Sequence, residues 1–167
     1  MSQILTPLRK ANLYLRMFGL FKVPLIWYCR PKIIHLDQNK VEVVIPLKKR
    51  NKNHLNSMYF GVLAVGADVA GGFMAMSKSQ ARGERISLAF KAVQAEFIKR
   101  PEADVVFTCQ DGALIDEMLE QAIVSGERIN RPVTITATCP TLHGDEPMAI
   151  FQLTLSIKKS SIKKHHN

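Results

Sequence analysis

The hydrophobic positions follow a helical period at the start of the chain. Over the first thirty residues, apolar side chains recur at near-helical spacing at Leu5, Leu8, Leu13, Met17, Leu20 and Phe21, with basic residues between them. The pattern predicts an amphipathic helical region that ends at Pro24 and Pro31. Such a region can pack on the body of the protein or lie on a membrane surface. Packing is the expected role, because amphipathic helices in globular proteins normally face a core.

The next pattern is typical of strands. Six segments, most of them alternating apolar and polar residues, predict strands at Ile33–Leu36, Val41–Leu47, Ile86–Lys99, Val105–Cys109, Val133–Cys139 and Ala149–Ile157. The parity of the apolar positions shifts within Ile86–Lys99, so we expect a bulge or bend there. An amphipathic segment, Ala113–Ser125, predicts a short helix that stops at Gly126.

One long apolar segment lies between the second and third predicted strands. We expect it to form a helix from Ser57 to Ser79, with Ser57 as its N-cap. Its stretch Met58–Met76 has nineteen residues and a single charge, Asp68, so it could span a bilayer by length alone. A carboxylate near the centre would cost about 2.5–3.5 kcal/mol on insertion scales, and four glycines interrupt the segment. An α+β fold, with a curved antiparallel sheet enclosing this helix, is therefore expected.

Composition and charge fit a single globular domain. The chain has 167 residues, of which 47% are hydrophobic. Its three cysteines, Cys29, Cys109 and Cys139, are scattered, so we expect buried free thiols, no metal site and a reducing, cytoplasmic compartment. The net charge of +9 favours an anionic partner, such as the phosphates of coenzyme A or a membrane surface. Aromatic residues do not alternate with the basic ones, so no nucleic-acid partner is expected.

The residues that open the long helix match a known pattern. From Asn51 the chain reads Asn-Lys-Asn-His-Leu-Asn-Ser-Met-Tyr-Phe-Gly, and Asp68 follows seven residues after that glycine. This run resembles the loop-and-helix signature of a branch of the hotdog-fold thioesterase-like superfamily, a branch labelled mainly as a domain of unknown function. That signature reads Asn-x-Asn-x-x-Gly-Thr-His-Phe-Gly-Gly, followed by an acidic residue. The resemblance covers residues 33–157.

The resemblance implies a hotdog fold, in which a curved antiparallel sheet wraps around one long apolar helix. The chain would then divide into an N-terminal helical extension (1–31), a hotdog domain (32–159) and a disordered basic tail (160–167). Ser57 and Tyr59 are conservative at the threonine and phenylalanine of the signature, and two departures matter: Met58 stands at the histidine and Asn56 at a glycine. A histidine at this position usually helps to place a thioester carbonyl or water, so Met58 favours binding over hydrolysis.

The resemblance also implies where a site would lie. Asp68 is the candidate catalytic residue, a base or nucleophile whose pKa burial would raise. The alternative is a structural carboxylate, hydrogen-bonded in the core or paired with Lys or Arg. Free N–H groups at the start of the helix, at about Tyr59 to Gly61, would donate to the oxyanion of a thioester. The substrate-binding candidates are Asn53, Met58, Tyr59, Phe60 and Gly61. The alternative role of Asn53 is to shape a turn, and the alternative role of Tyr59 and Phe60 is to pack in the core.

Two functions are expected from this set of residues. The first is hydrolysis of acyl-CoA or acyl-carrier thioesters at a dimer interface, where Asp68 would face the helix N-terminus of the second chain. The basic loop Lys48–Lys52 would meet coenzyme A phosphates. The second function is non-catalytic binding of an acyl group or lipid by the same fold. We expect a homodimer or a tetramer of dimers, no cofactor apart from coenzyme A as part of the substrate, and peripheral membrane contact as a further option.

Overall fold

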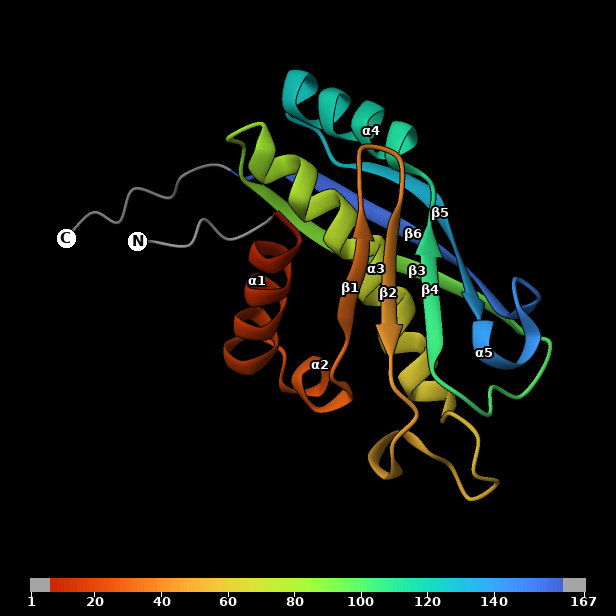
Figure 1. Ribbon diagram of the computed structural model, residues 1–167. Coiled ribbons are helices and arrows are strands. Elements are labelled where there is room, and N and C mark those ends of the chain that lie inside the picture. The colour runs from red at the N-terminus through yellow and green to blue at the C-terminus, as the bar shows by residue number, and fades with distance from the viewer. Residues whose placement is uncertain (1–6, 161–167) are drawn as a thin grey trace, which may run out of the picture.

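The computed structural model of the chain describes residues 7–160. The strands are β1 (Lys32–Leu36), β2 (Val41–Ile45), β3 (Ile86–Phe97), β4 (Val105–Cys109), β5 (Ile129–Thr138) and β6 (Pro147–Lys159). The helices are α1 (Pro7–Phe21), α2 (Pro24–Cys29), α3 (Phe60–Ala81), α4 (Gly112–Ser125) and α5 (Pro140–His143), with a 3₁₀ turn at Lys49–Asn51. In this part of the chain the strands form one antiparallel sheet, in the order β1–β2–β4–β5–β6–β3, which curves around α3 (Figure 1). This is the α+β hotdog arrangement that the sequence predicts.

The elements follow the predicted order, and the differences lie at their ends. Pro24, which is predicted to end the first helical region, instead begins α2, because a missing N–H costs nothing at the first position of a helix. The short helix α5 is not predicted by the periodicity. Leu5 and the predicted basic tail, apart from Ser160, lie outside the described residues.

Helix α3 begins later than the sequence predicts. Its N-cap is Tyr59, which makes no side-chain capping bond. The predicted cap, Ser57, is buried, and its hydroxyl donates to the Asn53 side-chain oxygen at 3.2 Å. The predicted N-cap is therefore wrong, because Ser57 uses its hydroxyl within the preceding loop.

The body of α3 is enclosed by the sheet and by α4. Most of its 22 residues are buried, and Gly66 lies directly under the ring of Phe107 from β4. By length and composition α3 could cross a membrane, but 61% of its most apolar window is buried inside the fold. A helix buried in this way forms the core of a domain, as the sequence predicts.

The N-terminal helices pack on this core, and the expected packing role of the first helical region is confirmed. Leu15 of α1 and Ile26 and Cys29 of α2 belong to the same hydrophobic core as α3. The side chain of Asn12 also pairs with the backbone of Ile33 in β1, accepting from its N–H at 2.9 Å and donating to its carbonyl at 2.8 Å. Helix α1 therefore lies along the outer edge of the sheet (Figure 1). The three cysteines are free and buried, as expected.

Among residues 7–160, strand β3 forms the other edge of the sheet and pairs only with β6. Its register shifts between Phe90 and Ala92, so the predicted bulge is confirmed. None of its twelve residues is fully buried, although Val93 and Phe97 carry large apolar side chains. This edge thus exposes both unpaired backbone groups and apolar surface.

Candidate functional site

Four of the predicted substrate-binding residues come together at the start of α3. They line a cavity of about 270 Å³ that lies between the loop before α3 and the end of β3. Its lining comprises Asn53, His54, Ser57, Met58, Tyr59, Phe60, Leu63, Phe97, Lys99, Arg100 and Pro101. The fifth predicted residue, Gly61, does not line it. We call this space the helix-start cavity.

Asn51 fixes the loop that leads into α3. Its side-chain NH₂ group donates to the backbone carbonyls of Cys29 and Pro46, at 3.2 and 2.8 Å, and its backbone carbonyl accepts from the N–H of Tyr59 at 2.9 Å. One fully buried residue therefore ties α2, the end of β2 and the start of α3 together. The sequence pattern includes Asn51 but assigns it no task. Its positioning role emerges only when the three segments are seen to converge.

Asn53 shapes the same loop from its other side. Its side-chain oxygen accepts from the N–H groups of Leu55 and Ser57, at 2.9 and 3.2 Å, and from the Ser57 hydroxyl. These bonds are those of a turn residue, which is the role expected of Asn53 as the alternative to substrate binding. Asn56 has a φ of 62°, a left-handed conformation that glycine adopts freely and asparagine tolerates. The departure from the signature at this position thus preserves the backbone conformation.

The residues that follow differ in exposure. Met58 is buried and donates its N–H to the carbonyl of Pro101 at 2.8 Å. Tyr59 and Phe60 are 47% and 60% exposed, so neither packs in the core, which is the alternative to substrate binding for both. The ring of Tyr59 covers Gly61, where an added Cβ would lie 2.7 Å from the ring. The group that lies close against Gly61 is therefore the ring of Tyr59.

The first turn of α3 offers two free backbone donors. The N–H of Tyr59 is taken by the carbonyl of Asn51. The N–H groups of Phe60 and Gly61 have no hydrogen-bond partner among residues 7–160. The predicted set of donors is thus reduced by one, and the remaining pair sits at the positive end of the helix dipole.

Asp68 lies in a different cavity, of about 200 Å³, between α1, α3 and β3. The surrounding side chains are almost all apolar: Tyr14, Leu15, Phe18, Val23, Ile26, Val69, Phe73, Met76 and Leu88, together with Gly72. Within the described part of the chain the carboxylate has neither a hydrogen-bond partner nor an ion-pair partner. Burial raises the pKa of Asp68 above its ordinary value. The structure therefore shows no partner of the kind that a structural carboxylate would need.

The two cavities lie at different heights along α3. Seven residues separate Gly61 from Asp68, which is about 10 Å along a helix. Phe60, Ala64 and Asp68 share one face of α3, because they are four residues apart, and none of the three is fully buried. One thioester carbonyl cannot reach the donors and Asp68 of the same chain at once.

Two further cations, Lys99 and Arg100, line the helix-start cavity. The sequence pattern does not single them out, because Lys99 ends a predicted strand and Arg100 follows it. Lys99 forms an ion pair with Glu146, whereas Arg100 has no ion-pair partner in residues 7–160. Lys52 lies nearby, because its backbone bridges to that of Met58. These side chains supply positive charge next to the free donors.

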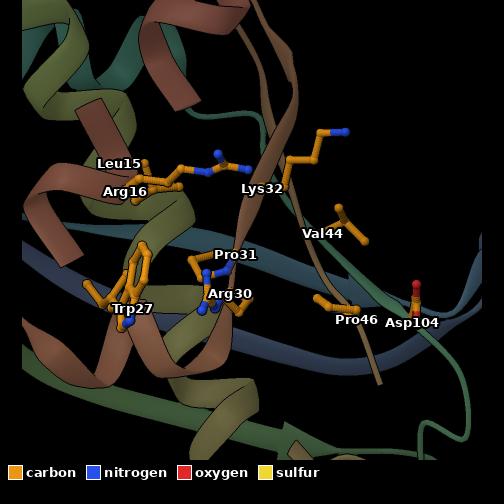
Figure 2. Close-up of a pocket in the computed structure, with 10 residues that line it drawn as sticks. Leu15, Arg16, Trp27, Arg30, Pro31, Lys32, Val44, Pro46 and Asp104 are labelled. Atoms are coloured by element: carbon orange, nitrogen blue, oxygen red, sulfur yellow. The ribbon is translucent and has the colours of Figure 1, made fainter. Parts of the chain in front are cut away.

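A third cavity, of about 300 Å³, lies between α1, α2 and the strands β1 and β2. Figure 2 shows Arg16, Arg30 and Lys32 around it, with Asp104 at the far end. The sequence pattern does not single out this cavity.

No group of three His, Cys, Asp or Glu side chains that could hold a metal ion lies in the described part of the chain.

Comparison with protein families identifies the family of the chain. Residues 11–145 match the model of a domain of unknown function, DUF4442. The chain belongs to the DUF4442 family. The match begins inside α1, so the family domain includes most of that helix. No curated protein matches the chain at the level of sequence.

Solved structures similar to this DUF4442 chain share its fold. A Pseudomonas aeruginosa protein of unknown function, named "Probable Thioesterase", is 18% identical with a TM-score of 0.74, over 95% of this chain and 100% of that one. A Chlorobaculum tepidum protein of unknown function is 16% identical with a TM-score of 0.80, over 93% and 98%. A thioesterase from Haemophilus influenzae is 14% identical with a TM-score of 0.64, over 98% of both chains. At these identities the likeness establishes the hotdog fold.

Proposed function

We propose that the protein acts on acyl-CoA or acyl-carrier thioesters at a site shared by two copies of the chain. The observation that carries this proposal is Asp68, a carboxylate without a partner among the described residues, set in an apolar cavity of the core helix. Leaving such a group unpaired costs stability, so functional sites are where such groups concentrate. The fold shared with proteins named as thioesterases agrees with this reading.

Thioester hydrolysis assigns a step to each group. Asp68, a stronger base than an ordinary carboxylate because its pKa is raised, takes a proton from a water molecule. The water oxygen bonds to the thioester carbon, and the carbonyl oxygen becomes an oxyanion that the N–H groups of Phe60 and Gly61 stabilise. The carbon–sulfur bond then breaks, the thiolate receives the proton from Asp68, and a carboxylic acid and a thiol are released.

The two halves of this mechanism require a second chain. Asp68 and the free donors of one chain lie about 10 Å apart along α3, too far for both to contact one carbonyl. An antiparallel neighbour would bring the start of its α3 next to Asp68. Strand β3 offers the surface for such pairing, because its outer edge has no partner among the residues that the structure describes and it carries exposed Val93 and Phe97.

Hydrolysis assays over a panel of acyl-CoA chain lengths test the proposal. The wild-type protein is expected to release thiol, and Asp68→Asn to lower kcat about a hundredfold or more, as loss of a general base does. Asp145→Asn, an exposed carboxylate in the loop before β6, is the matched control and should retain full activity. Lack of turnover with every chain length, or full activity in Asp68→Asn, would refute the mechanism.

The cations of the helix-start cavity allow a separate test of the coenzyme. Arg100→Ala should raise KM for an acyl-CoA, because it removes a cation available to phosphate. It should leave KM unchanged for the matching N-acetylcysteamine thioester, which has no phosphate. Equal effects on both substrates would count against coenzyme A recognition by this residue.

Dimer formation can be measured independently. Val93→Lys places a charge on the exposed edge of β3, and light scattering after size-exclusion chromatography should show a dimer for the wild type and a monomer for the variant. A wild-type monomer that hydrolyses thioesters would overturn the shared site.

A second function, acyl or lipid binding without catalysis, is favoured by one observation. Met58 occupies the position of the signature's histidine and is buried, so the helix-start cavity lacks the side chain that usually places the carbonyl or water. Native mass spectrometry of gently purified protein would then detect a retained acyl ligand. An empty protein with clear turnover would argue for the enzyme.

A further inference from the structure

Helix α1 is apolar on two opposite faces. Its inner face packs Ala11, Leu15 and Phe18 against the core. Its other face carries four large apolar side chains that are exposed to solvent: Leu13, Met17, Leu20 and Phe21. Their spacing of four, three and one residues places them on one side of the helix. A helix that only packs on a domain needs one apolar face, so the second one requires another explanation.

Helix α2 adds two exposed apolar side chains. Leu25 and Tyr28 are exposed, and α1 and α2 lie on the same side of the molecule (Figure 1). We call Leu13, Met17, Leu20, Phe21, Leu25 and Tyr28 the α1–α2 outer surface. Six of the fifteen exposed large apolar side chains of residues 7–160 belong to it. Apolar surface this concentrated marks an interaction site rather than the scattered exposure that is normal.

The segment that carries this surface has charge of one sign. The first 36 residues contain no Asp or Glu and six basic residues: Arg9, Lys10, Arg16, Lys22, Arg30 and Lys32. All six are exposed, and Arg16 and Lys32 make no ion pair with any described residue. The occupant of this surface must therefore combine negative charge with an apolar interior.

Three of these cations converge on the cavity shown in Figure 2. Arg16 reaches it from α1, Arg30 from the end of α2 and Lys32 from β1. Arg30 has a left-handed backbone, with a φ of 59°, and its guanidinium lies 4.0 Å from the ring centroid of Trp27. The carboxylate of Asp104 at the far end is engaged by the N–H of Leu47 at 2.8 Å. At about 300 Å³ the cavity has room for a phosphate group.

We propose that the α1–α2 outer surface docks on a bilayer that contains anionic lipids. The six apolar side chains enter the interfacial region, the flanking cations contact headgroup phosphates, and the cavity of Arg16, Arg30 and Lys32 receives one such phosphate. A second copy of the chain fits the surface poorly, because a two-fold contact would set its cations against the same cations.

Docking would also place the Asp68 cavity near the membrane. Tyr14 and Phe18, on the side of α1 that faces the core, line that cavity. Only the thickness of one helix, about 10 Å, separates the cavity from the outer surface. An acyl ligand could then pass between bilayer and cavity over a short path. Docking itself does not depend on thioester hydrolysis, and its test does not measure it.

Vesicle flotation with the full-length protein tests the proposal. We expect binding to vesicles of equimolar phosphatidylcholine and phosphatidylglycerol, weakening as salt is raised, and little binding to pure phosphatidylcholine. No binding to the anionic vesicles, or equal binding to both compositions, would overturn it.

Point variants on the outside of the helices keep the test independent of folding, whereas deletion of α1 would expose Leu15 and the rest of the core. Phe21→Glu, at 67% exposed, should lower the vesicle partition coefficient about tenfold or more, because its ring can no longer enter the bilayer. Val124→Glu makes the same change at a residue of α4 that is 82% exposed and should leave binding unchanged. Equal losses in both would reduce the effect to net charge and overturn the assigned surface.

The cation cavity has its own matched pair. Arg16→Ala should weaken binding to anionic vesicles more than Arg100→Ala, which removes the same charge from the β3–β4 loop, away from α1 (Figure 1). Circular dichroism melts verify that each variant is folded. Equal effects would refute a role for the cavity. Concentration-dependent self-association that Phe21→Glu abolishes, in the absence of vesicle binding, would identify a second copy as the occupant and overturn the proposal.

Discussion

The contact between α3 and the sheet predicts opposite effects for the same substitution at two glycines of one helix. An added Cβ at Gly66 would lie 2.3 Å from ring atoms of Phe107, which is fully buried. At Gly72 the nearest atom, on the ring of Phe90, would be 3.8 Å away, an ordinary contact. Both positions lie inside α3, so the intrinsic preference of a helix for alanine over glycine is common to both.

The magnitudes follow from two terms. Alanine in a helix interior is about 1 kcal/mol more favourable than glycine. Forcing a methyl group into a packed core costs about 1–3 kcal/mol, and the cost at Gly66 should reach the upper part of that range because the ring it meets, Phe107, is fully buried. We therefore expect Gly72→Ala to raise the free energy of unfolding by up to about 1 kcal/mol. Gly66→Ala should lower it by about 1–2 kcal/mol.

Denaturant and thermal unfolding measure this difference. For a domain of this size a change of 1 kcal/mol shifts Tm by about 2–4 °C, so the two variants should melt several degrees apart. In a Phe107→Leu background, which removes the ring, the loss caused by Gly66→Ala should shrink. Equal stabilisation by both substitutions would refute the tight seating of α3 against β4.

Three further predictions concern buried polar groups. Because burial raises the pKa of Asp68, its protonation favours the folded state, and this contribution is lost as pH rises through the folded-state pKa. Asp68→Asn should therefore gain stability relative to wild type as pH increases, in denaturant titrations at about pH 4 and about pH 7; a difference that does not change with pH would contradict the raised pKa. Asp116→Ala should lower the free energy of unfolding by about 2 kcal/mol, because it leaves Lys78, only 7% exposed, without its partner. Glu117→Ala, which breaks an exposed pair, should change it by less than about 1 kcal/mol, and equal losses would contradict this account. Asn51→Ala should cost about 2 kcal/mol, because two backbone carbonyls lose their donor; a loss near zero in the same unfolding assay would show that water replaces the amide.

The spacing of apolar residues along the sequence predicts most of the helices and strands. The shift of parity in the sequence of β3 predicts a bulge within the strand, and the register shifts after Phe90. Side chains alternate between the two faces of a strand, so apolar residues change parity where an extra residue is inserted. The ends of elements are less predictable, since local hydrogen bonds compete for the same side chains. Ser57 is a good N-cap by type, but Asn53 engages its hydroxyl and α3 starts after Tyr59.

The candidate site is only partly predictable for a different reason. The signature identifies the loop before α3 and Asp68, yet no periodicity tells that they open into separate cavities. Tyr59 and Phe60 look like core residues because apolar type alone does not distinguish a buried face from one left open. Arg100 is missed because it shares the cavity with residues 53–63, which lie 37 to 47 positions earlier in the sequence.

The two edges of the sheet are treated differently, and this sets how copies of the chain can add to one another. At β1 the side chain of Asn12 occupies the backbone of Ile33, and the register shifts beside it. The outer side of β3 has no partner strand in the described part of the chain. A sheet with two free edges can grow without limit into a fibre, whereas a sheet with one free edge is complete after a single addition. The N-terminal helix, by closing β1, would thus limit edge-to-edge growth to pairs.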